Sequence, residues 1–264
     1  MQREIGMKKA QTIMLTAVAV SLTVTTSQGA IFSDFESPTY TAASDATGEL
    51  GGKDNWVTAI GSLSRARVTP TYDADIAANI TTVLDGSQSM YLKGTQAYRG
   101  WNGLESFVQD GLEISWLMQV DAATRAELYL SPDVAGLSTP IGLQFQNDGD
   151  IIAATPNSGF VDTGENYIVD KTYRFTMLVD FTNGTVDFTG QNVTDGGGVI
   201  NLGTGNTGSI SPVDYATGGG LYLVERDSKR AFFDTIEVVP EPGTAMLLAM
   251  GGLAVLWRRR CIKM

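Results

Sequence analysis

The sequence predicts an all-β fold, an antiparallel sandwich of the jelly-roll type, in the part of the chain that lies between two apolar ends. Apolar and polar residues alternate there in many short segments, and turn residues separate these segments every 8–12 residues or so, as in antiparallel sheets. The same part, residues 31–238, shows little helical periodicity. At about 200 residues it is longer than the roughly 100 residues of an immunoglobulin-type sandwich. We expect a single domain there, because no repeat or linker divides it.

Residues 1–30 have the features of a secretory signal peptide. A basic start precedes the apolar stretch Ile13–Val24, and the small residues Ser27 and Gly29 follow at the spacing that a signal peptidase requires. This pattern predicts export by the Sec machinery and removal of the segment. An uncleaved N-terminal membrane anchor is the alternative, but it would need a longer apolar stretch.

The clearest predicted strand is Leu112–Val120, where every second residue is apolar. Successive side chains of a strand point to opposite faces, so this segment has one buried face. Thr172–Phe181 follows the same rule. The other predicted strands are Ile31–Glu36, Leu63–Val68, Ala126–Leu130, Ile141–Gln146, Ile151–Ala154, Thr185–Phe188, Leu221–Val224 and Ala231–Val239.

Two dipeptides between these segments predict tight hairpins. They are Asn183-Gly184 and Asp148-Gly149, and both residue pairs readily adopt the positive φ angles of a two-residue turn. The flanking strands should therefore pair antiparallel. The stretch Asn201–Ser211 is rich in Gly, Ser, Thr and Asn and is expected to be a surface loop.

The body of the chain is strongly acidic and lacks two residue types that catalysis often uses. Residues 31–240 contain 11 Lys and Arg against 27 Asp and Glu, a formal charge of −16 (11 minus 27). Nucleic-acid binding needs Lys and Arg at the phosphates, so no nucleic-acid partner is expected. The sequence has no histidine, and its one cysteine is Cys261, near the C-terminus. The body therefore has no disulfide, no Ser-His-Asp or Cys-His arrangement, and no His or Cys ligands for zinc.

Residues 239–264 form a separate C-terminal segment. It contains the triplet Pro240, Glu241 and Pro242, an apolar run, and the arginines Arg258, Arg259 and Arg260. The apolar run predicts a transmembrane helix at 243–257, which is shorter than the roughly 20 residues that usually span a bilayer. The arginines should stop the segment in the membrane and remain on the cytoplasmic side.

This arrangement resembles the PEP-CTERM protein-sorting signal of Gram-negative bacteria, over about a tenth of the chain. The resemblance implies that an exosortase, a membrane cysteine protease, recognises and cleaves the tail. The protein would be anchored transiently in the inner membrane and would end at the cell surface or in the extracellular matrix. An ordinary single-pass C-terminal anchor is the alternative.

Short motifs at both ends of the body resemble those of a known sandwich family. Near the start they are Phe35-Glu36, Trp56 and Ser89–Gly94, and the segment Asp234–Val238 ends the body. They are similar to concanavalin A-like domains of the LamG type, which many PEP-CTERM proteins carry. The resemblance implies a jelly-roll sandwich.

Carboxylates are the remaining candidates for catalysis, as in glycosidases that use an Asp or Glu pair. Glycosidases of the concanavalin A-like class carry the pattern Glu-x-Asp-x-x-Glu on one strand, and this pattern is absent. Glu113, Glu127 and Asp121 are scattered over predicted outward-facing positions, where each is expected to be a solvated surface charge. We therefore expect no enzymatic activity.

Exposed aromatic side chains and loop carboxylates are the candidates for binding. Trp101, in a glycine-containing stretch, and the nearby Tyr98 are candidates for packing against carbohydrate. Asp148 and Asp150 are candidates for a calcium site, although calcium takes six to eight oxygen ligands and both acids also suit a plain hairpin.

Together these features predict an exported, exosortase-sorted protein that is not an enzyme and binds polysaccharide at the cell surface or in the matrix. Two alternatives remain. One is a secreted glycoside hydrolase or other polysaccharide-modifying enzyme of the sandwich class, and the other is a structural biofilm or adhesion protein without a small ligand.

Overall fold

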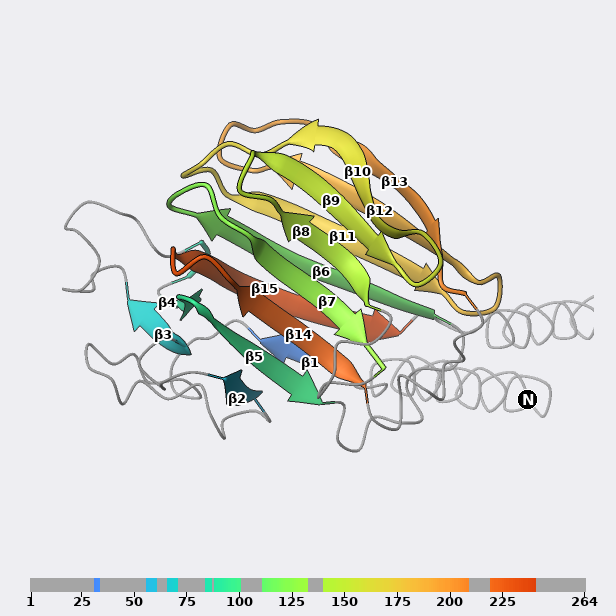
Figure 1. Cartoon of the computed structure of the whole chain (residues 1–264), viewed down its shortest axis with the longest axis horizontal. Helices are drawn as coiled ribbons and strands as arrows, with labels where there is room; N and C mark the ends of the chain where they lie inside the picture. Colours follow the sequence, from blue (N-terminus) through green and yellow to red (C-terminus); the bar gives the residue numbers. More distant parts are fainter. Residues whose placement is uncertain are drawn as a thin grey trace, which may run out of the picture. The chain divides into compact units, whose positions relative to one another are not determined.

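The computed structural model describes residues 31–33, 56–60, 66–70, 84–86, 88–100, 111–132, 140–208 and 219–240. These residues form two antiparallel sheets that pack on a common core (Figure 1). The predicted all-β antiparallel sandwich is confirmed. The described part contains no helix long and apolar enough to cross a membrane. The predicted signal peptide, residues 1–30, and the predicted transmembrane helix, 243–257, lie outside the described residues.

Every strand pairing in the two sheets is antiparallel. In spatial order, the eight-stranded sheet contains β13 (Ile200–Asn206), β12 (Thr185–Asn192), β11 (Tyr173–Asp180), β6 (Gly111–Val120), β15 (Ala231–Pro240), β4 (Gln88–Leu92) and β3 (Ala66–Pro70), while β1 (Ile31–Ser33) pairs with β15. The seven-stranded sheet contains β10 (Gly159–Asn166), β9 (Asp150–Thr155), β8 (Ile141–Phe145), β7 (Ala126–Ser131), β14 (Gly220–Glu225), β5 (Thr95–Gly100) and β2 (Trp56–Ile60).

The core consists of the side chains that the two sheets turn toward each other. In β11 buried residues alternate with more exposed ones, as the sequence predicts. Phe145 of β8 and Phe175 of β11 lie with ring centroids 5.6 Å apart, and this contact joins the two sheets. Trp116 of β6 packs against the same Phe175 ring at 5.6 Å. A largely aromatic cluster therefore holds the middle of the sandwich together.

Both predicted hairpins are confirmed. Gly184 (φ 69°) lies in the turn between β11 and β12, and Gly149 (φ 105°) lies in the turn between β8 and β9. Each glycine has the positive φ that favours it at a tight turn.

The prediction of a surface loop at Asn201–Ser211 is wrong for residues 201–206, which belong to β13. The sequence also gave no indication of β10, which is exposed at seven of its eight positions. Both are edge strands, and each pairs with only one neighbour of its own sheet. An edge strand with little burial lacks the apolar alternation that makes a strand visible in the sequence.

A bulge in β15 changes which of its residues face the core. The pairing with β6 shifts register between Asp234 and Glu237. Phe233, Ile236 and Val238 consequently lie in the core. Strict alternation along the sequence therefore assigns the wrong face to residues on one side of the bulge.

The bulge residue Asp234 is fully buried, at 0% exposure. Its carboxylate accepts hydrogen bonds from Ser89 Oγ at 2.7 Å, from the Asp85 backbone N–H at 3.1 Å and from the Thr235 N–H at 2.8 Å. Burial raises the pKa of Asp234 to about 7, although these donors oppose the rise. The described part of the chain thus contains a carboxyl group that titrates near neutral pH.

We predict that Asp234 makes the protein less stable as the pH rises from about 4 to about 7. The unfolded chain releases this proton near the ordinary pKa of 3.8, whereas the folded state keeps it until about pH 7. The folded state therefore binds more protons in this range, and the free energy of unfolding falls with rising pH, by about 1.4 kcal/mol or less per unit of pKa difference. Urea unfolding followed by tryptophan fluorescence measures the change. If the stability difference between wild type and Asp234→Asn is the same at every pH from 4 to 8, the prediction is wrong.

Candidate functional site

A row of aromatic and small residues crosses the outer face of the seven-stranded sheet, the face opposite the core. The strand registers place its members side by side, in the order Tyr98 (β5), Tyr222 (β14), Tyr129 (β7), Gly142 (β8), Ala154 (β9) and Phe160 (β10). Tyr98, Tyr222, Tyr129 and Ala154 belong to an apolar cluster separate from the core. We call this row the aromatic row.

The rings of the aromatic row touch in pairs. Tyr98 and Tyr222 lie nearly parallel, with centroids 6.3 Å apart and an angle of 7° between the rings. Tyr129 and Phe160 meet edge to face at 6.3 Å. Two strands separate this second pair, so the rings reach each other across Gly142 and Ala154. Tyr222 and Tyr129 are buried in this arrangement, while Tyr98 is half-buried and Phe160 is 62% exposed.

Gly142 is required at its position because two groups occupy the space above it. A β-carbon there would lie 2.0 Å from the Leu128 carbonyl oxygen and 2.7 Å from Cδ1 of the Tyr129 ring. The absence of a side chain at Gly142 thus lets the Tyr129 ring lean toward Phe160. The shape of the face depends on this glycine.

Hydrogen-bonding groups accompany the rings. The Tyr129 hydroxyl donates to Gln144 Oε1 at 2.7 Å. Burial raises the pKa of Tyr129 well above its ordinary value, so the hydroxyl keeps its proton at neutral pH. The face therefore combines apolar rings with a fixed hydroxyl and an amide.

Glu127 lies beside the row and is held by Arg226. The guanidinium donates to both carboxylate oxygens, with Nε to Oε1 at 2.7 Å and Nη2 to Oε2 at 2.9 Å. The Glu127 side chain is only 2% exposed, whereas that of Arg226 is 42% exposed. The expectation that Glu127 is a solvated surface charge is therefore wrong. Burial raises the pKa of Glu127, and the bidentate contact with Arg226 opposes that rise.

The other two acids considered for catalysis lie elsewhere. Glu113 is exposed on β6, in the eight-stranded sheet, as expected of a surface charge. Asp121 follows the end of β6 and accepts a hydrogen bond from Arg230 Nη1 at 2.8 Å. The structure thus does not bring Glu113, Glu127 and Asp121 together.

The two acids predicted for calcium take part in the β8–β9 hairpin. Asp148 Oδ1 accepts from the Asp150 N–H at 3.3 Å, and Asp150 Oδ1 accepts from Asn166 Nδ2 at 2.7 Å. Across the described ranges, no three acidic side chains gather in a metal-binding group. Calcium at this turn stays a prediction.

Of the two aromatic candidates from the sequence, Tyr98 belongs to the aromatic row and Trp101 lies outside the described residues. Sequence reasoning missed Tyr222, Tyr129 and Phe160. The alternation of strand faces could have indicated Tyr129, because it lies two residues from Glu127 on β7 and so points to the same face. Apolar residues at both even and odd positions of β7 and β14 concealed this alternation.

The fold and this face define an all-β sandwich with an aromatic outer surface on one sheet. The C-terminal segment of the chain gives a more specific assignment than the fold does. Residues 238–260 match the family model described as the PEP-CTERM protein-sorting motif. The resemblance of the C-terminal segment to that signal is confirmed, and the motif indicates an exported protein that an exosortase sorts. No curated protein sequence matches the chain.

Several solved structures are similar in fold. A GH131 β-glucanase catalytic domain from Podospora anserina has 11% identity and a TM-score of 0.46, over 76% of this chain and 92% of that one. Arcelin-5, a lectin-like defence protein from Phaseolus vulgaris, has 6% identity and a TM-score of 0.45, over 80% and 96%. The cellulose-induced protein Cip1 has 15% identity and a TM-score of 0.46, over 79% and 96%. These values describe a general likeness of fold only.

We predict that Gly142→Ala destabilises the protein by about 1–3 kcal/mol, because the new methyl group must displace backbone and the Tyr129 ring. Urea unfolding gives the change in free energy. The matched control is Gly198→Ala, since a β-carbon at Gly198 meets no atom within 4 Å. Equal stability of the two variants would show that the close approach over Gly142 is not a constraint.

Proposed function

We propose that this protein is exported, is sorted and cleaved by an exosortase, and binds polysaccharide through the aromatic row without catalysing a reaction. The main observation in support of polysaccharide binding is that Phe160 and Tyr98 remain accessible at the two ends of a row of otherwise buried rings. Apolar rings pack against the apolar faces of sugars, and the polar groups around them fix orientation.

The sorting part of the proposal rests on the tail. The matched motif spans residues 238–260 and includes the Pro240-Glu241-Pro242 triplet and the arginines at 258–260. In this proposal the Sec machinery exports the chain, the segment 243–257 holds it transiently in the inner membrane, and the arginines remain on the cytoplasmic side. Cleavage then releases the body to the cell surface or extracellular matrix of a Gram-negative bacterium.

The negative charge of the protein disfavours acidic polysaccharides as ligands. The chain carries a formal charge of −11, and an acidic protein repels a polyanion in solution. Arg226 places a cation beside the row, but its charge is already paired with Glu127, to which Nε and Nη2 donate. A neutral polysaccharide suits this surface better than an acidic one.

The proposal that the face is not catalytic rests on Glu127. A glycosidase needs two carboxylates about 5–9.5 Å apart, one of them free to transfer a proton or attack the sugar. Glu127 is bound bidentately by Arg226, and the other two acids considered lie elsewhere. A glycoside hydrolase remains the alternative function.

We predict that the exported protein ends before Trp257, because cleavage removes the arginine-bearing tail. Mass spectrometry of the protein recovered from the cell surface and from the medium determines its C-terminus. Replacing both Pro240 and Pro242 by Ala should retain the uncleaved form in the membrane fraction. Peptides that extend past residue 257 in the released wild-type protein would refute exosortase processing.

We predict that Phe160→Ala and Tyr98→Ala each weaken binding to a neutral polysaccharide by about three- to tenfold, because each removes a ring from the contact surface. Affinity gel electrophoresis in laminarin, xylan or galactomannan measures the change. Val199→Ala is the control, since Val199 is 68% exposed and lies outside the row. If retardation in the gel is the same for all three variants, the aromatic row is not the binding face. Release of reducing ends by the wild type would instead support the hydrolase.

A further inference from the structure

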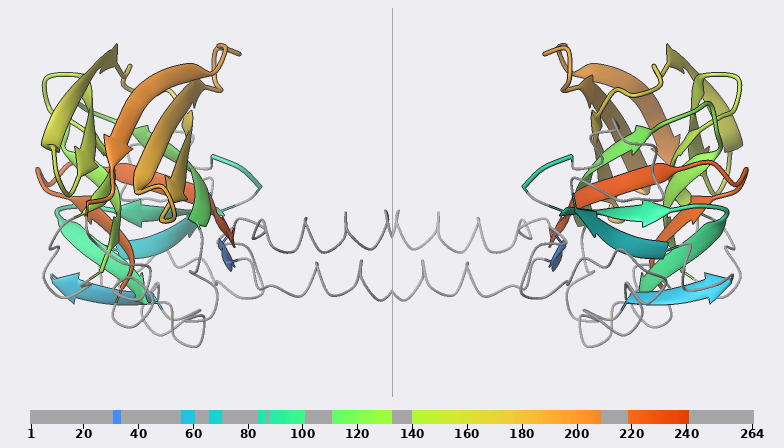
Figure 2. Two further views of the ribbon diagram at one scale, coloured as in Figure 1. Left: turned by 90° about the vertical axis from the view of Figure 1, so that its right-hand side faces the viewer. Right: turned by 90° about the vertical axis from the view of Figure 1, so that its left-hand side faces the viewer.

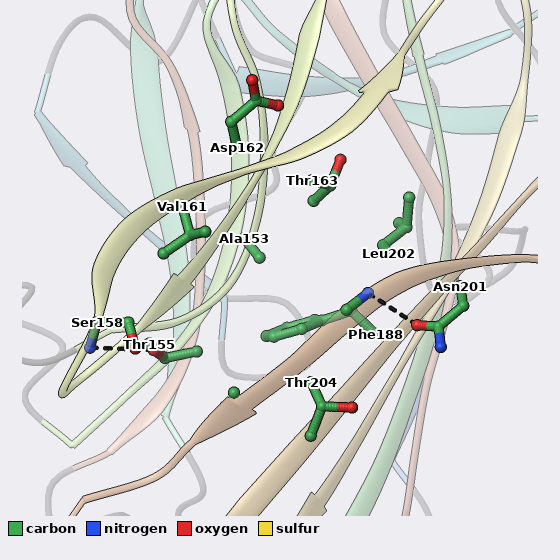
Figure 3. Close-up of a pocket in the computed structure, with 12 residues that line it drawn as sticks. Ala153, Thr155, Ser158, Val161, Asp162, Thr163, Phe188, Asn201, Leu202 and Thr204 are labelled. Atoms are coloured by element: carbon green, nitrogen blue, oxygen red, sulfur yellow. Dashed lines mark hydrogen bonds between the residues drawn. The ribbon is translucent and has the colours of Figure 1, made fainter.

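A concave site, distinct from the aromatic row, lies between the edges of the two sheets. A cavity of about 440 Å³ opens between β9 and β10 of one sheet and β12 and β13 of the other. Figure 2 shows these strands side by side at one end of the sandwich, and Figure 3 shows the residues that line the cavity. Small-molecule sites have volumes of about 300–1,000 Å³. The cavity is therefore large enough for a ring-sized ligand.

Contacts between the two sheets close one end of the cavity. Gly205 of β13 lies against Thr155 of β9, so closely that a β-carbon at Gly205 would be 2.3 Å from Thr155 Cγ2. Beside this contact, Asn157 Nδ2 donates to Asn206 Oδ1 at 3.2 Å. A long polymer cannot run through a cavity that is closed in this way, whereas a single ring or a chain end can enter it.

One wall of the cavity is apolar. Ala153, Phe188 and Leu202 form its buried wall, and Val161 is 47% exposed. Asp162 is the one ionisable side chain among the described residues that line it, and in Figure 3 its carboxylate points away from this wall. An ionic ligand would thus find no counter-charge inside, which favours a neutral one.

Two polar lining residues, Thr155 and Asn201, each have a hydrogen bond that fixes their orientation. Thr155 Oγ1 accepts from the Ser158 N–H at 3.4 Å and keeps its own hydrogen. Asn201 Oδ1 accepts from the Gly203 N–H at 2.8 Å, which leaves its amide N–H₂ group. Thr204 Oγ1 donates to the exposed Asp187 at 2.6 Å, on the face of β12 opposite the buried Phe188, so this hydroxyl points away from the apolar wall. A ligand that accepts hydrogen bonds matches the Thr155 hydroxyl and the Asn201 amide, and hydroxyl groups do so.

We propose that this cavity binds a single neutral sugar ring, either a free glycoside or the end of a glycan chain. The apolar face of the ring packs on the wall formed by Phe188, Leu202 and Val161, and its hydroxyls bond to Thr155 and Asn201. This site is separate from the aromatic row. β10 borders both, since Phe160 faces the row and the next residue, Val161, faces the cavity.

Titration with methyl glycosides of glucose, galactose and mannose tests the proposal, with amide NMR signals of Gly203 and Gly205 as the readout. We expect saturable shifts of both signals for at least one glycoside. Thr155→Val removes one hydrogen bond and should weaken binding about fivefold. Val161→Trp fills the mouth at a partly exposed position and should abolish the shifts.

Phe160→Ala is the matched control, because it changes the neighbouring residue on the opposite face of the same strand. It should leave glycoside binding in the cavity unchanged while it weakens polysaccharide binding. The proposal is overturned if no glycoside shifts the two glycine signals, or if Val161→Trp binds as the wild type does. It is also overturned if cyclohexanol, which lacks the set of hydroxyls, binds as tightly as the glycoside. None of these results affects binding at the aromatic row, which the polysaccharide gels test.

Discussion

The connection between β14 and β15 is the point on which both sheets depend. β14 lies in the middle of the seven-stranded sheet and β15 in the middle of the eight-stranded one, although they are consecutive in the chain. The buried carboxylate of Glu225, at the end of β14, accepts hydrogen bonds from Thr124 Oγ1 at 2.6 Å and from the backbone N–H groups of Asp227 and Lys229 at 2.9 and 3.1 Å. It also accepts one from the Gly94 N–H, in the turn between β4 and β5. The Glu225 side chain thus links β14 to the turn that leads into β15, and without these donors it would be a buried polar group with no hydrogen bond.

The same topology links the body to its sorting signal. The matched motif begins at residue 238, inside β15, whose last residue, Pro240, is paired with Leu112 of β6. No linker therefore separates the central strand of the sheet from the triplet that an exosortase would recognise. Proline suits this place, because it lacks a backbone N–H and commonly ends a ladder. The last strand needed to complete the sandwich is the one that leads directly into the matched sorting motif.

Sequence patterns predicted those parts of the fold that local chemistry determines. Leu112–Val120 alternates because one of its faces lies in the core, although the structure buries both faces from residue 116 to residue 120. The turn residues of the two hairpins need positive φ. The edge strands β10 and β13 could not be found this way, because they have little burial to impose a period. The environment of Glu127 could not be predicted either, since its partner Arg226 is 99 residues away in the chain. Tyr98 was identified because it is aromatic and close to Trp101 in the sequence, but its neighbours in the row come from strand register, which the sequence alone does not specify.

Strand β10 exposes apolar side chains that the folded core does not need. Phe160 is 62% exposed and Val161 is 47% exposed, on adjacent positions of an edge strand, where exposed apolar side chains promote aggregation. The same strand carries the usual protection against edge-to-edge pairing, with a register irregularity between Asp162 and Asn166 and a charge at Glu165. Had selection acted on solubility only, polar residues at 160 and 161 would have been simpler, because neither side chain is needed to complete the core. Two apolar residues at these positions are what the two proposed binding surfaces, on opposite faces of this strand, would require.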